Sequence, residues 1–504
     1  MMKNYRYTLL LTLALAAVST TGRADSLLKH LCDTVEFRTE ATGMFGGGEY
    51  APYWMTNNHY GLSTEENNAF IWRRSVKRGM EGDEGRKWKA GWGFELSNVV
   101  TKKWDWVVQE LYLDVQYKKV RLSLGQKERP SELLNTNLSS GGLVNGVNAR
   151  PIPQVRLELP DFWTVPGTKG WLALRAHISY GMYTDNKWQR DFVSSTGNLY
   201  SKNSLYHSKA GFVRLGNKSK LPLTLTGGLE MSSQFAGTVY NRLGSGGKMK
   251  LPSGLSSFWN VFIPGGSDPT DGDYPNKEGN TVGAWHLALQ YYGNEDNPAK
   301  AWNAKLYAQH MFEDESQMFW QYGWKDIMLG AEINLPKNPV VSTVLYEYLT
   351  SKDQSGPIYH DETSIIPDQI SALDNYYNHG LYGGWQHAGF GMGNGLFISP
   401  LYNNGSISFT HNRIQAHHVG ISGSPLKGLD YKLLFSYEKS WGTYAMPLID
   451  PQEGWTMFVQ AAYRPAWLKN CVVTLAYGHN GGKLLGNSNG VQIGFLYNVK
   501  LHAK

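Results

Sequence analysis

The sequence predicts a transmembrane antiparallel β-barrel of about 18 strands. Three observations support this fold class. Apolar and polar residues alternate with a period of two along much of the chain, short charged turns alternate with long loops, and aromatic residues and glycine are abundant (18 Trp, 30 Tyr, 18 Phe and 56 Gly among 504 residues). Outer-membrane barrels combine short periplasmic turns, long extracellular loops and aromatic girdles at both membrane interfaces.

The first 24 residues have the features of a secretory signal peptide. A basic start is followed by the apolar run TLLLTLALAAV, which is too short to span a bilayer as a helix, and small residues precede a cleavage site after Ala24. Cleavage lowers the formal charge from +6 to +3, because Lys3, Arg6 and Arg23 are lost without any acid. This near balance of basic and acidic residues argues against a nucleic-acid partner. With the predicted barrel, the signal peptide leads us to expect the chain in the outer membrane of a Gram-negative bacterium.

Residues 25–35 are expected to form a short periplasmic segment, and residues 36–504 a single barrel domain, because no linker or charge block divides them. The alternation is clear in residues 88–98, where Trp88, Trp92 and Leu96 share one face. A long polar connection at 126–153 separates the fifth expected strand from the sixth. The first seven strands are expected at 36–45, 70–78, 88–98, 106–117, 120–125, 155–159 and 171–181.

The second part of the chain contains strand pairs joined by short turns. Leu223 and Leu225 alternate with Thr224 and Thr226, which predicts a lipid-facing side and a polar lumen. Eleven strands are expected at 205–215, 221–232, 283–292, 302–312, 326–335, 340–350, 406–421, 429–441, 455–464, 471–479 and 491–499. Long connections fall at the opposite ends of these pairs, at 182–204, 233–282, 313–325, 351–405, 442–454 and 480–490.

Residues 351–405 form the longest of these connections and the main candidate binding region. Large rings such as Tyr376 and Trp385 are interleaved with short hydrogen-bonding groups such as Asn378 and His387. Flat rings beside such groups suit a neutral, hydroxyl-rich ligand such as a sugar. The alternative is that the same residues pack the loop into a cavity. The predicted carbohydrate contacts are Trp259, Asp353, Tyr376, Tyr377, Asn378, His379, Tyr382, Trp385 and His387.

No motif indicates a nucleotide site, a metal, a cofactor or a catalytic centre. The adjacent His417 and His418 would point to opposite faces of a strand, so they would not chelate together. The acidic stretch at 267–280 favours a solvated loop tip over a calcium site. The two cysteines, Cys32 and Cys471, are both expected near the periplasmic rim, where they could form a disulfide or remain two unpaired thiols.

Three stretches carry a resemblance to a known family: EYLTSKDQSG at 347–356, DNYYNH at 374–379 and YGGWQHAGFGMG at 382–393. Together they resemble the capsule assembly Wzi family of outer-membrane proteins, from about Phe37 to the C-terminus. The resemblance implies an eighteen-stranded barrel that assists assembly or attachment of capsular polysaccharide or exopolysaccharide by non-catalytic binding. That family's best-known form carries a helical plug on its periplasmic side, whereas the N-terminal segment of this chain offers little material for one.

The predicted function is therefore that of a monomeric outer-membrane barrel that binds a surface polysaccharide and contacts outer-membrane lipid. The sequence is compatible with two alternatives. A diffusion porin would use residues 351–405 as a constriction in its lumen. A surface hydrolase would need a nucleophile and a base brought together in space, which no local motif indicates.

Overall fold

The computed structural model describes residues 34–242, 246–269, 277–313, 318, 325–336, 338, 340–354 and 374–502. The predicted signal peptide and nearly all of the predicted periplasmic segment lie outside the described residues. No helix in the described part of the chain is long and apolar enough to cross a membrane.

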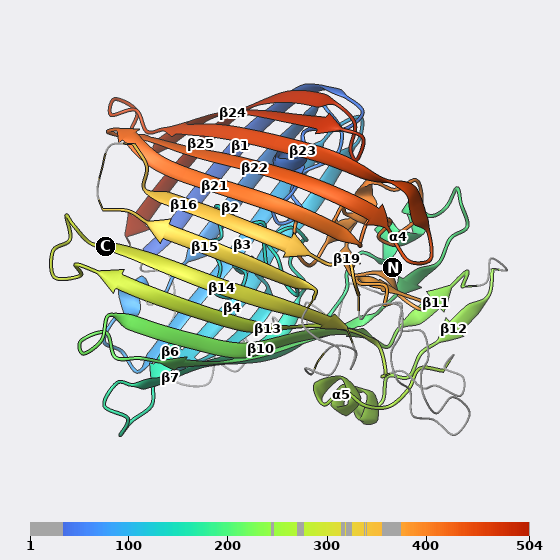
Figure 1. Ribbon diagram of the computed structural model, residues 1–504, viewed down its shortest axis with the longest axis horizontal. Helices are drawn as coiled ribbons and strands as arrows, with labels where there is room; N and C mark the ends of the chain where they lie inside the picture. The colour runs from blue at the N-terminus through green and yellow to red at the C-terminus, as the bar shows by residue number, and fades with distance from the viewer. Residues whose placement is uncertain are drawn as a thin grey trace.

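The barrel wall consists of eighteen strands, each paired antiparallel with the next along the chain (Figure 1). The last strand, Ser488–His502, pairs with the first, Thr34–Gly48, from Thr34 opposite His502 to Gly48 opposite Ser488, and this pairing closes the barrel. The prediction of an eighteen-stranded antiparallel barrel is confirmed. The strands are β1 (Thr34–Gly48), β2 (Ala69–Arg78), β3 (Trp88–Val100), β4 (Trp104–Tyr117), β5 (Val120–Gln126), β6 (Gln154–Thr164), β7 (Leu172–Met182), β9 (Leu205–Leu215), β10 (Leu223–Phe235), β13 (Asn280–Gly293), β14 (Trp302–Glu313), β15 (Ile327–Asn334), β16 (Thr343–Thr350), β21 (Ile414–Leu426), β22 (Leu429–Gly442), β23 (Pro447–Tyr463), β24 (Cys471–Gly482) and β25 (Ser488–His502).

Two expected strands differ clearly in position. The strand expected at 455–464 begins already at Pro447, so most of the long connection expected at 442–454 belongs instead to β23, which pairs with β22. The alternation at 406–421 predicts a strand from residue 406, but β21 begins at Ile414. Ile407 and Phe409 are buried because they pack against the preceding loop, where an added Cβ at Gly383 or Gly384 would meet them. The alternation at 406–409 therefore reflects packing inside the molecule and not the barrel wall.

The long connections contain short elements of their own. These lie at one end of the barrel, on the right in Figure 1, whereas the short turns and the C-terminus lie at the other end. By analogy with other outer-membrane barrels, the end with long connections is the extracellular one. The further elements are α3 (Tyr53–Thr56), η1 (Glu81–Asp83, in a periplasmic turn), α4 (Asn186–Phe192), β8 (Tyr200–Lys202), β11 (Thr238–Tyr240), β12 (Lys248–Lys250), α5 (Leu255–Phe262), β17 (Asn378–His379), β18 (Gly383–Gly384), β19 (Gln386–His387), β20 (Phe390–Gly391) and η3 (Pro400–Tyr402).

The two faces of the wall differ as the alternation predicts. On β10, Thr224, Thr226 and Glu230 are buried in the lumen, whereas Leu225 is exposed on the outside. Outward-facing aromatic residues gather near both ends of the wall. They include Phe45, Phe70, Trp72, Trp104, Trp106 and Trp455 toward the extracellular end, and Phe37, Trp88, Tyr117, Trp171, Tyr291 and Tyr463 toward the periplasmic end. Such girdles mark the two membrane interfaces, so the belt between them faces lipid.

Leu287→Lys is expected to destabilise the folded barrel by about 2–4 kcal/mol, because it places a charge on the lipid-facing belt. Leu287 lies on β13, 51% exposed, between the outward-facing Trp285 and Tyr291. The measurement is reversible unfolding from lipid vesicles in denaturant. The control is Gln290→Lys on the inward face of the same strand, where the added charge meets polar groups. Equal effects of the two substitutions would contradict the assignment of the faces.

Candidate functional site

Three extracellular connections fold back into the lumen and bind one another there. Tyr53 donates its hydroxyl to the Gly395 carbonyl at 2.6 Å, the Trp385 indole donates to the Val144 carbonyl at 2.9 Å, and the Asn148 amide donates to Ser399 Oγ at 3.1 Å. These bonds join residues 49–68, 127–153 and the described part of the third connection, 374–413. We call these three segments together the plug. Its described residues form loops with the short helical turns α3 and η3, and nearly all of the N-terminal segment considered for a periplasmic helical plug lies outside the described residues.

Residues 127–153 penetrate furthest. The Lys305 ammonium donates to the Leu133 carbonyl at 3.2 Å, and the Asn135 amide donates to Glu332 Oε1 at 3.1 Å. Lys305 and Glu332 lie close to the periplasmic ends of β14 and β15. The segment therefore starts at the extracellular end of β5, reaches the periplasmic half of the lumen and returns to β6.

A buried carboxylate holds the tip of this segment against the wall. Glu347 projects inward from β16 and is fully buried. It accepts hydrogen bonds from Ser139 Oγ at 2.6 Å, from the Ser140 backbone N–H at 2.8 Å, from Ser140 Oγ at 2.6 Å and from the Tyr307 hydroxyl at 2.6 Å. Since a buried carboxylate is costly unless its oxygens are hydrogen-bonded, these four donors fix both the acid and the plug tip.

His418 forms a second attachment on the neighbouring strand. Its Nε2 donates to the Leu138 carbonyl at 2.7 Å, and its Nδ1 lies 2.7 Å from Ser436 Oγ. The indole of Trp54, from another part of the plug, donates to the same Ser436 hydroxyl at 3.1 Å. His417 instead faces outward and contacts the Tyr346 hydroxyl. The prediction that the two histidines point to opposite faces is confirmed.

Most of the predicted carbohydrate contacts lie inside the plug. Tyr376, Tyr377, Tyr382 and Trp385 are all at most 1% exposed. Tyr376 donates its hydroxyl to Asp326 Oδ2 at 3.1 Å, and Tyr377 donates to the Leu143 carbonyl. Burial raises the pKa of all three tyrosines. These rings pack the loop into the lumen, as the alternative interpretation holds, and stacking on a sugar stays a prediction that would require the loop to leave the barrel.

The remaining predicted residues do not share one site. His387 is buried, with Nδ1 at 2.9 Å from the Arg150 carbonyl, and its burial lowers its pKa. Asn378 donates its amide to the Phe409 carbonyl at 2.8 Å. His379 and Asp353 are half-buried, and Trp259 lies on α5, 61% exposed. The sequence therefore groups residues that the fold distributes between the plug and the outside of the barrel.

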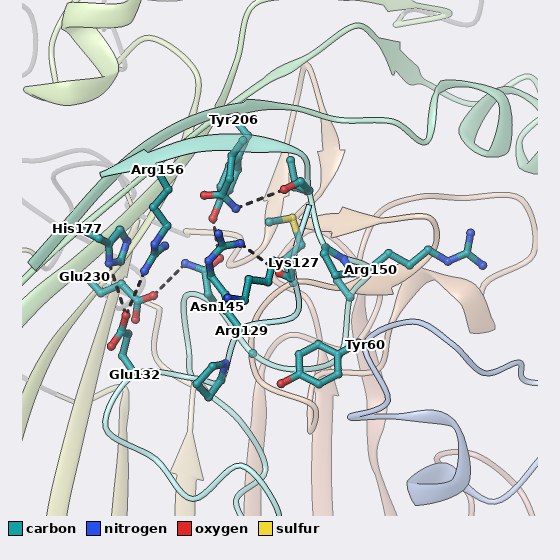
Figure 2. A pocket seen from close by; sticks show the side chains of 17 residues that line it. Tyr60, Lys127, Arg129, Glu132, Asn145, Arg150, Arg156, His177, Tyr206 and Glu230 are labelled. Atoms are coloured by element: carbon teal, nitrogen blue, oxygen red, sulfur yellow. Dashed lines mark hydrogen bonds and ion pairs between the residues drawn. The ribbon is translucent and has the colours of Figure 1, made fainter. Parts of the chain in front are cut away.

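A small cavity lies beside the plug near β6, β7 and β10 (Figure 2). Its volume is about 90 Å³, well below the roughly 300 Å³ at which ligand pockets begin. Its walls carry charged groups that are already paired, among them Glu132 with Arg156 and His177. Burial and the neighbouring Arg156 lower the pKa of Arg129 to about 10. Its small volume and paired charges make this cavity suited to water and not to a sugar.

A larger cavity of about 360 Å³ lies between the plug and the wall formed by β1, β2 and β22–β25. Both acids and bases line it, including Arg38, Glu40, Arg73 and Glu128. Arg38 pairs with Glu40 at 2.6 Å, and Arg73 pairs with Glu95 at 2.6 Å and with Glu128 at 2.8 Å, so these charges bind one another. We assign it to the hydrated space left between wall and plug.

A surface at the extracellular end carries two half-buried tyrosine rings beside positive charge. Strands β8, β11 and β12 form a separate three-stranded sheet, and cross-strand pairing places Tyr200, Tyr240 and Lys248 in one row and Lys202, Thr238 and Lys250 in the next. The two tyrosine rings stack at 4.9 Å with an angle of 8° between their planes, and the Lys202 ammonium lies 4.8 Å from the Tyr240 ring centre. We call these six residues the Tyr–Lys face.

The opposite side of this small sheet is buried. Val239 packs with Leu251, Leu381 and Tyr382. Tyr382, predicted as a sugar contact, thus supports the Tyr–Lys face from beneath. The Tyr–Lys face is not predicted from the sequence, because its strands are three residues long and too short for an alternating period to appear.

The structure describes one of the two cysteines. Cys471 begins β24 at the periplasmic end, as expected, and is buried without a disulfide partner among the described residues. Cys32 lies outside them, so the predicted pairing stays a prediction.

No group of three or more potential metal ligands occurs within the described ranges. Asp268 and Glu278 are buried, so the expectation of a solvated acidic tip is wrong for these two, and Asp271 and Asp273 lie outside the described residues.

No family model matches the chain, and no curated protein matches it in sequence. Solved structures do match. The Escherichia coli protein Wzi, described as a carbohydrate-binding β-barrel involved in group 1 capsule assembly, is 14% identical with a TM-score of 0.51, over 94% of this chain and 86% of that one. OccK5 and OprD of Pseudomonas aeruginosa are 10% and 9% identical, each with a TM-score of 0.47, and cover 94% and 93% of this chain and 99% and 94% of their own.

This is the fold of an outer-membrane β-barrel. At these identities the likeness to Wzi extends to the fold alone. The location in the outer membrane of a Gram-negative bacterium agrees with the prediction from the sequence.

Glu347→Gln is expected to loosen the plug tip. The substituted amide presents N–H groups to at least one of the present donors, and leaving buried donors unpaired costs about 1–3 kcal/mol. Hydrogen exchange of residues 138–148 should accelerate while exchange in the strands stays unchanged. Glu453→Gln is the matched control, since Glu453 pairs with Lys439 on the exterior. Unchanged exchange at 138–148 in Glu347→Gln would contradict the assigned attachment.

Protection of the segment around His59 should depend on pH. Burial and the nearby Lys432 lower the pKa of His59 to about 4, and neutral His59 donates Nε2 to the Trp54 carbonyl at 3.2 Å. The opened segment takes up a proton near pH 6.5 and the closed one does not, so protection is full above that pH and falls as the pH drops toward 4. His59→Gln should remove this dependence in hydrogen exchange corrected for intrinsic rates, whereas His417→Gln should preserve it.

Proposed function

We propose that this protein binds an acidic surface polysaccharide at its extracellular end and so assists the assembly or attachment of capsule or exopolysaccharide. It acts as a monomer and by binding, without catalysis. The Tyr–Lys face carries this proposal, because it is a preformed surface that combines half-buried tyrosine rings with the exposed positive charges of Lys248 and Lys250. Tyrosine rings pack against the apolar faces of sugar rings, and lysines attract carboxylates or other anionic groups on a polymer.

The geometry of the face suits a linear chain. The stacked Tyr200 and Tyr240 lie on the adjacent strands β8 and β11, so the row of side chains to which both belong runs across the sheet. Lys248 and Lys250 are exposed at its β12 edge, and Lys202 stands beside both rings. A polymer lying across the sheet would meet the rings first and the lysines on either side of them. Support for the sheet by Tyr382 and Leu381 makes the surface rigid before the ligand arrives, which reduces the entropic cost of binding.

Two further observations support binding over diffusion through a pore. The plug is attached to the wall at Glu347 and His418, and its three segments bind one another across the lumen. The fold also resembles that of Wzi, a protein described as binding carbohydrate. The porin alternative places the constriction in residues 351–405. In the structure, the described part of that connection is packed into a plug that also includes residues 49–68 and 127–153.

Replacing Tyr200 and Tyr240 together by Ala should release polysaccharide from cells. Each ring is expected to contribute about 1 kcal/mol, or roughly five-fold in the dissociation constant. The measurement is the ratio of cell-bound to released polymer in the parent strain, with total synthesis measured in parallel. Tyr463→Ala, an exposed tyrosine at the periplasmic end, is the matched control. Retention equal to that of the control would refute a role for this face.

The lysines are tested with purified protein. Affinity electrophoresis in gels containing alginate, a polyuronate, should retard the wild-type barrel more than gels containing neutral dextran, and added salt should weaken the retardation. Lys248→Gln with Lys250→Gln should reduce the difference between the two polymers. Equal mobility in alginate and dextran would show that the lysines do not select an acidic chain.

A further inference from the structure

Helix α5 packs against the outer surface of the barrel wall, beyond the lumen. Side chains at odd positions of β9 and at even positions of β7 point outward, because Tyr206 and His177 at the alternate positions contact groups inside the lumen. The outward-facing Tyr180 donates its hydroxyl to the Phe258 carbonyl at 3.0 Å, and Phe258 packs on Phe235 with ring centres 5.2 Å apart. Figure 1 shows the helix beside the extracellular ends of β10 and β13.

A lysine on the outer wall fixes the end of the helix. Lys209 points outward from β9, and its ammonium donates to the carbonyls of Val261, at 3.0 Å, and Phe262. The last carbonyls of a helix have no partner within the helix and carry the negative end of its dipole, so a cation is favourable there. The contact satisfies the helix end and shields a charge that would otherwise stand on the membrane-facing wall.

The helix leaves an apolar stripe uncovered. Leu255 and Trp259 are spaced four residues apart, which places them on one side of the helix, and Ile263 follows directly after its last residue. The three side chains are 90%, 61% and 52% exposed. Residues 251–267 contain no charged side chain. A loop that projected into water would be expected to carry charged side chains. An exposed apolar stripe would be unfavourable in water.

The height of the stripe matches the membrane interface. Lys209 lies opposite Met231 and Gly283 in the sheet, two residues nearer the extracellular end than the row that contains Gly211, Leu229 and Trp285. Trp285 faces outward on β13 above Leu287 and Leu289, which belong to the lipid-facing belt. The end of α5 that Lys209 holds therefore lies at the extracellular margin of this belt.

We propose that α5 is an interfacial helix that inserts Leu255, Trp259 and Ile263 into the outer leaflet of the membrane. Amphipathic helices with a Trp on the apolar side lie at this boundary between acyl chains and headgroups. The helix thus anchors one side of the extracellular loops to the lipid. Trp259, expected from the sequence to stack on a sugar, binds lipid in this assignment.

The native chain can be tested by hydroxyl-radical labelling in phosphatidylcholine nanodiscs that each hold one copy. Trp259 should lose most of its labelling, whereas Met446, 61% exposed at the tip of the β22–β23 hairpin, should be labelled freely after correction for intrinsic reactivity. One copy per disc excludes protection by a second molecule, and polysaccharide is absent. Labelling of Trp259 comparable to that of Met446 would overturn the proposal.

A second measurement uses nitroxide labels in a background without Cys32 and Cys471. Labels at Leu255→Cys and Trp259→Cys should be more accessible to oxygen than to a polar nickel complex, as lipid-embedded labels are. A label at Lys248→Cys on the Tyr–Lys face should show the opposite preference. Preference for the nickel complex at positions 255 and 259 would show that the stripe faces water.

Discussion

The position of the plug in the lumen depends on the hydrogen bonds that Glu347 accepts. Its carboxylate is buried in the barrel, and it is stable there because Ser139, Ser140 and Tyr307 donate to it. Those donors come from both the plug tip and the wall, so the same bonds that offset the cost of burying the acid also place residues 127–153. With that tip in position, the carbonyls of Leu143 and Val144 accept hydrogen bonds from Tyr377 and Trp385. These two bonds place the described part of the third connection, 374–413.

The extracellular surface follows from this plug. Tyr382 and Leu381 belong to the third connection, and they pack under Val239 in the small sheet that carries the Tyr–Lys face. On the side of α5, Lys209 and Tyr180 hold a helix that meets the lipid. The loops are thereby fixed at two places: from below by the plug, and at the side by an interfacial helix. A polymer would meet a preformed surface at a fixed height above the membrane.

Sequence alternation predicted the wall because each strand repeats a simple rule, lipid outside and polar lumen inside, over many residues. The rule failed at 406–409, where Ile407 and Phe409 alternate because they face the loop. Alternation did not predict that residues 127–153 fold into the lumen. The partners of this segment, Lys305, Glu332 and Glu347, lie far away in the sequence, and no local pattern links them to it. Aromatic residues such as Tyr376 and Trp385 marked an important segment, but composition alone does not distinguish a ring that packs a plug from one that binds a sugar.

Conductance of the wild-type barrel in planar lipid bilayers tests the closed lumen most directly. The account predicts insertion with little or no steady conductance. A variant in which residues 134–147 are replaced by a short Gly-Ser linker should conduct, which shows that insertion was successful and that this segment closes the lumen. Stable, open conductance of the wild-type chain would contradict the account and favour a diffusion porin.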